Sequence, residues 1–209
     1  GEYLEPRHLV GSGVHVYMFG AGIRTSHEEF GGRAVPTLEI LGNGTVECTA
    51  EYADCAQDHS GEGTRAAGVV AGKTFGVAKR AILHSVKVFK DSGEGHTWWF
   101  VAGIDWVLSR GQRPAVIYAN PQKDGNYRSV LLAIEGAVAA GVTVVVGAGD
   151  DAEEACFHSP ASSHFAITVG ATEKPNALNK DWLADYSNKG LCTNIFAPGS
   201  NIPSASHNS

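Results

Sequence analysis

The chain has 209 residues, 43% hydrophobic and 18% charged, which suits one packed α/β domain and is too apolar for a disordered chain. The net charge of −6 and the lack of a basic cluster argue against a nucleic-acid or anionic-membrane partner. No apolar run approaches the ~20 residues needed to span a bilayer. The start at Gly-Glu-Tyr, without Met or a signal peptide, is expected of a processed or trimmed product.

Taken in chain order, the predicted elements alternate between apolar strands and helices. Because the strands read as continuous apolar runs, we expect a mostly parallel sheet covered on both faces, in a single domain without repeats or linkers. Ligands bind at the carboxyl ends of such strands. The predicted elements are a strand at 14–19, an irregular surface excursion over 31–58, a helix at 64–72, a strand at 82–89, a helix at 98–108, a strand at 115–118, a helix at 130–140, and strands at 142–146, 166–169 and 194–196.

The segments at and after these strand ends carry the motifs of one family. They are residues 16–34 with Gly-Ala-Gly, 61–68 (G-E-G-T-R-A-A-G), 75–79, 86–88, 102–106, 145–149, 159–162, 168–171, 187–190 and 195–199. In this order they resemble subtilisin-like serine peptidases (subtilases) of the proteinase K kind. The resemblance implies an α/β, subtilisin-like three-layer fold with a mostly parallel central sheet. The C-terminal segment with the nucleophile helix is absent, so residues 1–209 are expected to form a single incomplete domain.

The positions that carry catalysis in subtilases hold other residues here. A subtilase uses a Ser nucleophile, a His base, an Asp that orients the His, and an amide donor for the oxyanion. The resemblance places Gly20 at the Asp, Glu62 at the His and Asp150 at the oxyanion Asn, with Arg65 at the second His of the helix motif. The G-T-S-M-A segment is not in the chain. The resemblance therefore predicts a pseudopeptidase, kept as a structural or protein-binding subunit of a larger secreted assembly.

An alternative comes from sedolisins, which share the fold and use a Glu and an Asp at two of these positions. Glu62 and Asp150 reproduce both, and a protonated Asp can donate to an oxyanion at acid pH. The chain would then be a serine endopeptidase fragment whose Ser lies on a missing C-terminal part. Sedolisins place a second carboxylate one turn after the Glu, however, and Ala66 stands there.

The substrate groove implied by the resemblance is altered as well. On one edge a proline lacks the N–H that pairs with a peptide backbone. On the other, the bulky Trp98 and Trp99 follow a pair of glycines. The groove positions are Pro121, Gln122 and Lys123 on the first edge and Gly93, Glu94 and Gly95 on the second.

A few polar and aromatic residues outside these motifs admit more than one interpretation. Asp58 and His59 could form a repositioned acid–base pair or a metal site, but a surface polar pair before a helix is the expected outcome. His27 is expected to make structural hydrogen bonds. Tyr118 could line a retained peptide cleft, although packing in the core or at the rim is the default.

The four cysteines are even in number and form no CxxC pair, which argues against zinc and is compatible with two disulfides. The resemblance implies a bridge between Cys156 and Cys192, and Cys48 and Cys55 are then paired by elimination. The tripeptide Asn43-Gly-Thr is a glycosylation sequon. Together these features predict an extracellular or secretory-pathway location.

The resemblance also bears on cofactors and partners. The family's strong calcium site uses backbone carbonyls near 161–166 and one Asp, and Asn194 stands at that Asp, so we expect no tight calcium site and no other cofactor. A missing helix of ~15 residues would expose several large side chains at ~1.5–3 kcal/mol each. We therefore expect a protein partner, or the remainder of the polypeptide, to cover the exposed core.

Overall fold

The computed structural model describes residues 10–52, 54–121, 123–173 and 181–206. By its internal contacts the chain divides into two compact units. The first unit comprises Gly1–Gly93, Gln112–Pro114 and Pro203–Ser209, and the second comprises Glu94–Gly111 and Ala115–Ile202. Each is built of helices and mostly parallel strands, so the α/β class predicted from the sequence is confirmed. No helix in the described ranges is long and apolar enough to cross a membrane. The expectation of a single domain stays a prediction.

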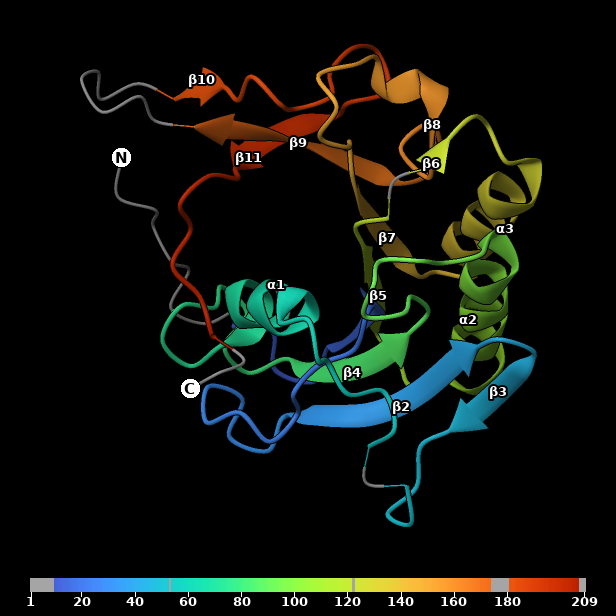
Figure 1. The fold of residues 1–209 in the computed structure, drawn as a ribbon, viewed down its shortest axis with the longest axis vertical. Helices are drawn as coiled ribbons and strands as arrows, with labels where there is room; N and C mark the ends of the chain where they lie inside the picture. Colours follow the sequence, from blue (N-terminus) through green and yellow to red (C-terminus); the bar gives the residue numbers. More distant parts are fainter. Residues whose placement is uncertain (1–9, 53, 122, 174–180, 207–209) are drawn as a thin grey trace. The chain divides into compact units, whose positions relative to one another are not determined.

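The described part of the first unit contains four strands and one helix (Figure 1). Its strands are β1 (His15–Gly20), β2 (Ala34–Leu41), β3 (Gly44–Glu47) and β4 (Ile82–Lys87), in the order β1-β4-β2-β3. β1, β4 and β2 run parallel, whereas β3 is an antiparallel edge strand. Helix α1 (Glu62–Ala71) contacts β1 and β4 through small buried residues, because alanines and glycines let it approach the sheet closely.

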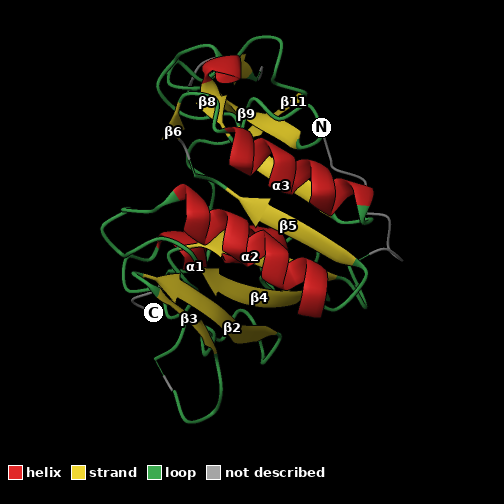
Figure 2. Ribbon diagram, turned by 90° about the vertical axis from the view of Figure 1, so that its right-hand side faces the viewer, coloured by secondary structure: helices red, strands yellow, loops and turns green. Residues whose placement is uncertain are grey.

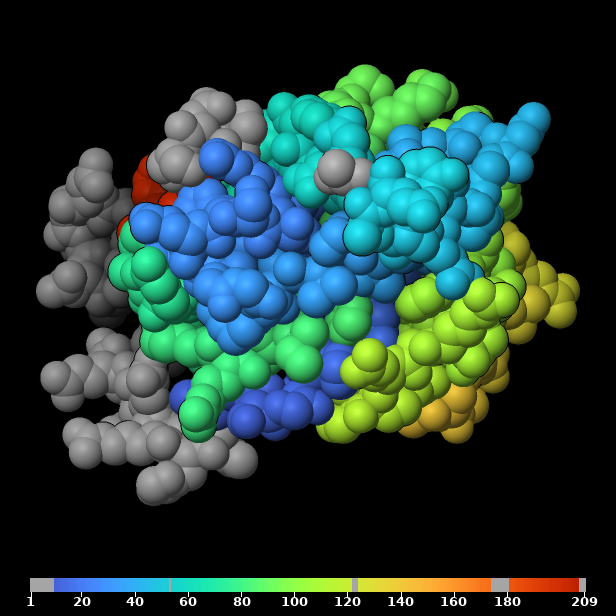
Figure 3. Space-filling model, turned by 90° about the horizontal axis from the view of Figure 1, so that it is seen from below, coloured from blue at the N-terminus to red at the C-terminus, as the bar shows by residue number. Residues whose placement is uncertain are grey.

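The prediction of an irregular excursion over 31–58 is wrong for its first half. Residues from Ala34 to Glu47 form the β2–β3 hairpin, whose register shifts between Pro36 and Leu38. Only Ala34, Leu38 and Ile40 of β2 are buried, and all of β3 is exposed, so the segment lacks a continuous apolar run. The blue-to-cyan part of the chain that includes this hairpin lies at the surface in Figure 3.

Two buried histidines on neighbouring strands of the first unit, His15 on β1 and His84 on β4, contact each other. Nε2 of His84 lies 2.9 Å from Nδ1 of His15, and Nδ1 of His84 lies 3.0 Å from the hydroxyl of Thr37. The ring of His84 also stacks on Tyr17, with centroids 4.5 Å apart. Burial, and then repulsion from His15, lower the pKa of His84 to about 4.

We expect this histidine to make the fold weaken in mild acid. Between about pH 6.5 and 4, His84 takes up a proton in the unfolded chain but stays neutral in the folded chain. The free energy of unfolding therefore falls as the pH falls through this window. The shift corresponds to roughly 3 kcal/mol, lost mostly before pH 4. Urea unfolding at pH 7, 5.5 and 4 measures it. In His84→Gln this part of the pH dependence should disappear, and an unchanged pH dependence in that variant would contradict the assignment.

The main strands of the second unit are mostly parallel and follow the order β10-β9-β7-β5, with β11 also paired to β9. Helices α2 and α3 lie side by side, and α3 contacts β7 (Figure 2). A separate two-stranded sheet joins β6 to β8. The elements are α2 (Thr97–Arg110), β5 (Ala115–Ala119), β6 (Lys123–Asp124), α3 (Arg128–Ala139), β7 (Thr143–Gly147), the 3-10 helix η1 (Ala155–Phe157), β8 (His158–Ser159), β9 (Ile167–Glu173), β10 (Trp182–Leu183) and β11 (Ile195–Pro198).

Candidate functional site

Two glycine-framed turns meet in the first unit, one after β1 and one at the start of α1. A Cβ on Gly63 would lie 1.9 Å from the carbonyl oxygen of Gly22, and a Cβ on Gly22 would lie 2.4 Å from that of Gln57. Gly22 also has φ +110, which side chains rarely adopt. This close approach of the backbones therefore fixes the turn after β1 and the start of α1 relative to each other.

The residues at these two turns offer few groups that could take part in catalysis. Gly20 ends β1 and offers no side chain, although a Cβ built there has open space within 4 Å. Glu62 is the first residue of α1, and its side chain is exposed. Arg65 is exposed on the same helix, and its carbonyl accepts a hydrogen bond from Ser204. A subtilase-like dyad would need a carboxylate and an imidazole at Gly20 and Glu62, and neither is there.

Asp58 was expected at the surface, and that prediction is wrong. Asp58 is 5% exposed, and its carboxylate accepts hydrogen bonds from the backbone N–H and hydroxyl of both Ser60 and Thr64 and from the N–H of Gly61. Gly61, the residue before α1, has no side chain with which to cap it, so Asp58 satisfies the orphan donors of the helix instead. Its role is structural, whereas its neighbour His59 is exposed and lies 3.5 Å from Asp54.

The hydrogen bonds also set the charge state of this carboxyl. Burial by itself would raise the pKa of Asp58, but the bonds from Thr64, Gly61 and Ser60 outweigh that effect and hold the pKa below its ordinary value. A carboxylate that is fully engaged in this way is a poor general base, because its lone pairs are already occupied. The contacts of Asp58 therefore favour a structural role over a repositioned acid–base pair.

A buried lysine lies at the end of β4, directly across from Gly20 in the strand register. The Nζ atom of Lys87 donates to the carbonyl oxygens of Ala21 and Gln57 and to Oδ1 of Asp91 at 2.7 Å. With three acceptors for its three protons, the ammonium group is saturated. The Lys87 ammonium group, with all three protons donated, thus links the turn after β1 to the neighbouring strand β4.

In the second unit Asp150 follows β7 after a turn at Gly149, which has φ +103. The side chain is exposed and borders a cavity of about 610 Å³. The walls of the cavity come from Tyr118 and from the strands β7, β9 and β11, including Val145, Val169 and Pro198. Tyr118 thus lines a cavity, and its place in a retained peptide cleft stays a prediction.

The groove positions predicted from the sequence are scattered over different elements. Pro121 and Lys123 lie after β5, where Lys123 begins β6; Gln122 lies outside the described residues. Gly93 closes the first unit, and Glu94 and Gly95 begin the second, before α2. Trp99 is a core residue at 1% exposure, whereas Trp98 is 45% exposed.

The remaining predicted residues have structural surroundings. His27 is buried, accepts from the N–H of Glu29 and lies 3.0 Å from the carbonyl of Ser206. The side-chain oxygen of Asn194 accepts from the N–H of Thr168 at 2.7 Å. The expectation of no cofactor stays a prediction. The doubt about a tight calcium site at Asn194 stays a prediction as well.

Both disulfides are present. Cys48 joins Cys55 across seven positions, and Cys156 joins Cys192 across 36. The second bridge packs with Ala148, Ala155 and Ala161 in a small core beside η1. Asn43 lies in the exposed turn between β2 and β3, where a glycan would meet no packed surface, and its glycosylation stays a prediction.

The structure brings together one group of residues that the sequence analysis missed. Asp124, Asp151 and His158 come from β6, from the turn after β7 and from β8, and their candidate ligand atoms lie within 4.8 Å of one another. No spacing rule points to them, because the pairing of β6 with β8 is what brings Asp124 opposite His158. The only signal in the sequence was a histidine among acidic residues.

A family profile and individual curated proteins match nearly the whole chain. A sequence profile of the Subtilase family matches residues 11–209. The chain is 44% identical over 196 residues to an extracellular serine proteinase of Thermus sp. (strain Rt41A), covering 93% of this chain and 44% of that protein. It is 38% identical over 197 residues to alkaline serine exoprotease A of Vibrio alginolyticus, covering 93% and 34%. The chain thus spans less than half the length of these curated relatives.

Among solved structures, the chain matches the crystal structure of a cold-adapted subtilisin-like serine proteinase. The TM-score is 0.82 at 32% sequence identity, and the match covers 96% of this chain and 68% of the other. The strands and helices described above therefore have the arrangement of that fold.

Proposed function

Because the chain belongs to the subtilase family, we propose that it is a catalytically inactive member whose fold serves as a structural or protein-binding subunit. One observation carries this proposal. The contact between Gly22 and Gly63 holds the two catalytic frames in register, and the residues within them are Gly20 and Glu62. On this proposal the family's orienting Asp and its base are absent from two turns that otherwise keep the family's glycines.

The expected loss of rate is large. Absence of the orienting carboxylate alone costs about 10⁴-fold, and loss of an oxyanion donor about 10²- to 10³-fold. These losses need not multiply, because the catalytic residues act as a unit. Exposed Asp150 would in addition bring negative charge towards the place where an oxyanion forms.

The surface of the second unit supports a binding role. The strands that line the cavity and their neighbours expose large apolar side chains. Patches of this kind mark interaction sites. We propose that a protein partner, or the remainder of the polypeptide, covers them. The exposed apolar residues are Ile167, Trp182, Leu183, Tyr186, Ile195 and Phe196.

The setting we propose is extracellular. The Thermus relative is named an extracellular proteinase, and this chain has two disulfides, which persist in oxidising compartments. The sequon at Asn43 would be used in a eukaryotic secretory pathway, and a mass increase removable by a glycosidase would report it.

The full-length protein, incubated with a fluorophosphonate probe and with casein from pH 3 to pH 9, is expected to show neither labelling nor turnover. An active relative under the same conditions is the positive control. Labelling and turnover at acid pH that disappear in Glu62→Gln would instead establish the sedolisin-like alternative through Glu62 and Asp150. Turnover at neutral pH would refute both. For the binding role, native mass measurement should give a species heavier than the free chain, and a lone monomer would count against it.

A further inference from the structure

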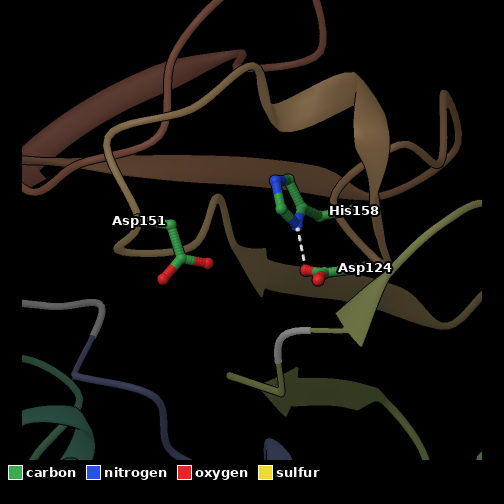
Figure 4. Close-up of side chains that lie close together, drawn as sticks. All are labelled: Asp124, Asp151 and His158. Carbon is green, nitrogen blue, oxygen red and sulfur yellow. Dashed lines mark ion pairs between the residues drawn. The ribbon is translucent and has the colours of Figure 1, made fainter.

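We propose that Asp124, Asp151 and His158 form a binding site for a divalent transition-metal ion of the zinc type, with Glu153 as a positioning residue. The three side chains come from three different segments of the second unit and lie close together (Figure 4). Imidazole nitrogen combined with carboxylate oxygen is a donor set that suits zinc and its neighbours, whereas calcium and magnesium prefer oxygen alone. The site is independent of the proposed loss of peptidase activity.

The first observation is the state of His158. Its side chain is 2% exposed, and Nδ1 is buried without a hydrogen bond from any described residue. That nitrogen nevertheless lies 3.2 Å from Oδ1 of Asp124. A buried polar atom without a hydrogen bond is costly and rare, so it requires a partner.

The second observation concerns the other ring nitrogen. Nε2 of His158 lies 3.1 Å from Oε2 of Glu153, and since a carboxylate only accepts, Nε2 must carry the proton. In the neutral ring Nδ1 then presents its lone pair to the Asp124 carboxylate, so that two electron-pair donors face each other. A cation between them resolves the conflict. A carboxylate that receives the far N–H of a metal-binding imidazole is the usual outer partner in such sites.

The distances are compatible with a metal. With bonds of about 2.0–2.2 Å to zinc, a nitrogen and an oxygen 3.2 Å apart subtend an angle of about 100°, close to tetrahedral. Asp151 lies somewhat farther out, and its exposed carboxylate has to move inward by about 1 Å to complete three ligands. A fourth position stays open to water, because both Asp124 and Asp151 are exposed.

The backbone that carries these groups is held in place before any metal arrives. The fully buried Asn188 accepts from the N–H groups of Asp151 at 3.1 Å and Glu153 at 2.9 Å, and its own amide donates to Ala148. Asp124 and His158 are directly opposite each other in the β6–β8 pair. A site arranged in advance loses little entropy on binding.

Isothermal titration of the metal-stripped, tag-free chain with Zn²⁺ tests the proposal. We expect one equivalent to bind with micromolar or tighter Kd, and Co²⁺ to give visible d–d bands of a four-coordinate site. Asp124→Asn and Asp151→Asn, which change exposed groups and should fold normally, are expected to weaken binding more than the 10- to 100-fold typical of a lost outer partner. Glu153→Gln should weaken it within that range. Saturating Zn²⁺ should raise the Tm of the unaltered chain and not of Asp124→Asn.

The matched control is His59→Gln, which removes an exposed histidine 3.5 Å from a single carboxylate and should leave the affinity unchanged. Failure of the unaltered chain to bind Zn²⁺ or Co²⁺ at millimolar concentration would overturn the proposal. Binding that Asp124→Asn and Asp151→Asn both leave intact would overturn it too, by placing the metal elsewhere.

Discussion

Replacing Asp58 with alanine is expected to lower the free energy of unfolding by about 4 kcal/mol. The carboxylate accepts five hydrogen bonds, and three of the donors are backbone N–H groups at and before the start of α1. Loss of a helix cap costs about 0.5–2 kcal/mol, and each buried donor left without a partner costs about 1–3 kcal/mol. Water that enters the vacated space recovers part of this sum.

Urea unfolding followed by far-UV circular dichroism measures the loss. Asp54→Ala, in the same loop, is the control: its side chain is 82% exposed, and we expect a change within about 0.5 kcal/mol. Equal effects of the two substitutions would show that the cap is not what matters.

The effect of Asp58 should also depend on pH. Since the folded-state pKa of Asp58 is lowered, its contribution is present above the pKa of the unfolded chain and is lost as the pH falls through the folded-state value. The gap in stability between the unaltered chain and Asp58→Ala should therefore narrow in strong acid, below the range in which His84 acts. A gap that stays constant down to pH 2 would contradict the lowered pKa.

The second large effect is expected from the long disulfide. Replacing Cys156 and Cys192 with alanine opens a loop of 36 residues, and the loop-entropy relation gives a loss of about 4 kcal/mol. The bridge between Cys48 and Cys55 closes only seven residues, for which the same relation gives about 2 kcal/mol. The two double variants are thus matched in chemistry and differ in loop length.

Thermal and urea unfolding of the two double variants, side by side, provide the comparison. We expect Cys156→Ala/Cys192→Ala to be the weaker protein by about 1–2 kcal/mol. The reverse order would mean that packing around the sulfurs, rather than the length of the loop, determines the contribution of each bridge.

The elements that could be predicted from the sequence are those with continuous apolar runs. The strand expected at 14–19 is β1, the strand at 82–89 is β4, and the helix at 130–140 is α3, with ends displaced by one or two residues. β1 and β4 are buried along nearly their whole length, and α3 buries one face at helical spacing, so their patterns are visible without knowing the fold. The β2–β3 hairpin was missed because it is half-exposed, and two-residue strands such as β10 leave no pattern at all.

The candidate site was predictable only where a motif gave the position. Gly20, Glu62 and Asp150 could be named because each has a glycine of its motif within two positions. The cap provided by Asp58 was not found, since helix-start rules look for a polar residue immediately before the helix and Gly61 stands there. His158 could not be connected to Asp124 because strand pairing, a long-range event, brings them together.

The close approach of Gly22 to Gly63 has a consequence for how such chains are classified. A side chain at either glycine would collide with backbone, so the two must stay small whether or not the protein cuts peptides. Gly20 is under no such restriction, because a Cβ built there meets no atom within 4 Å. The glycine signature is thus a steric requirement of the scaffold. Detecting it identifies the architecture, while enzymatic competence has to be judged from the side chains between the glycines.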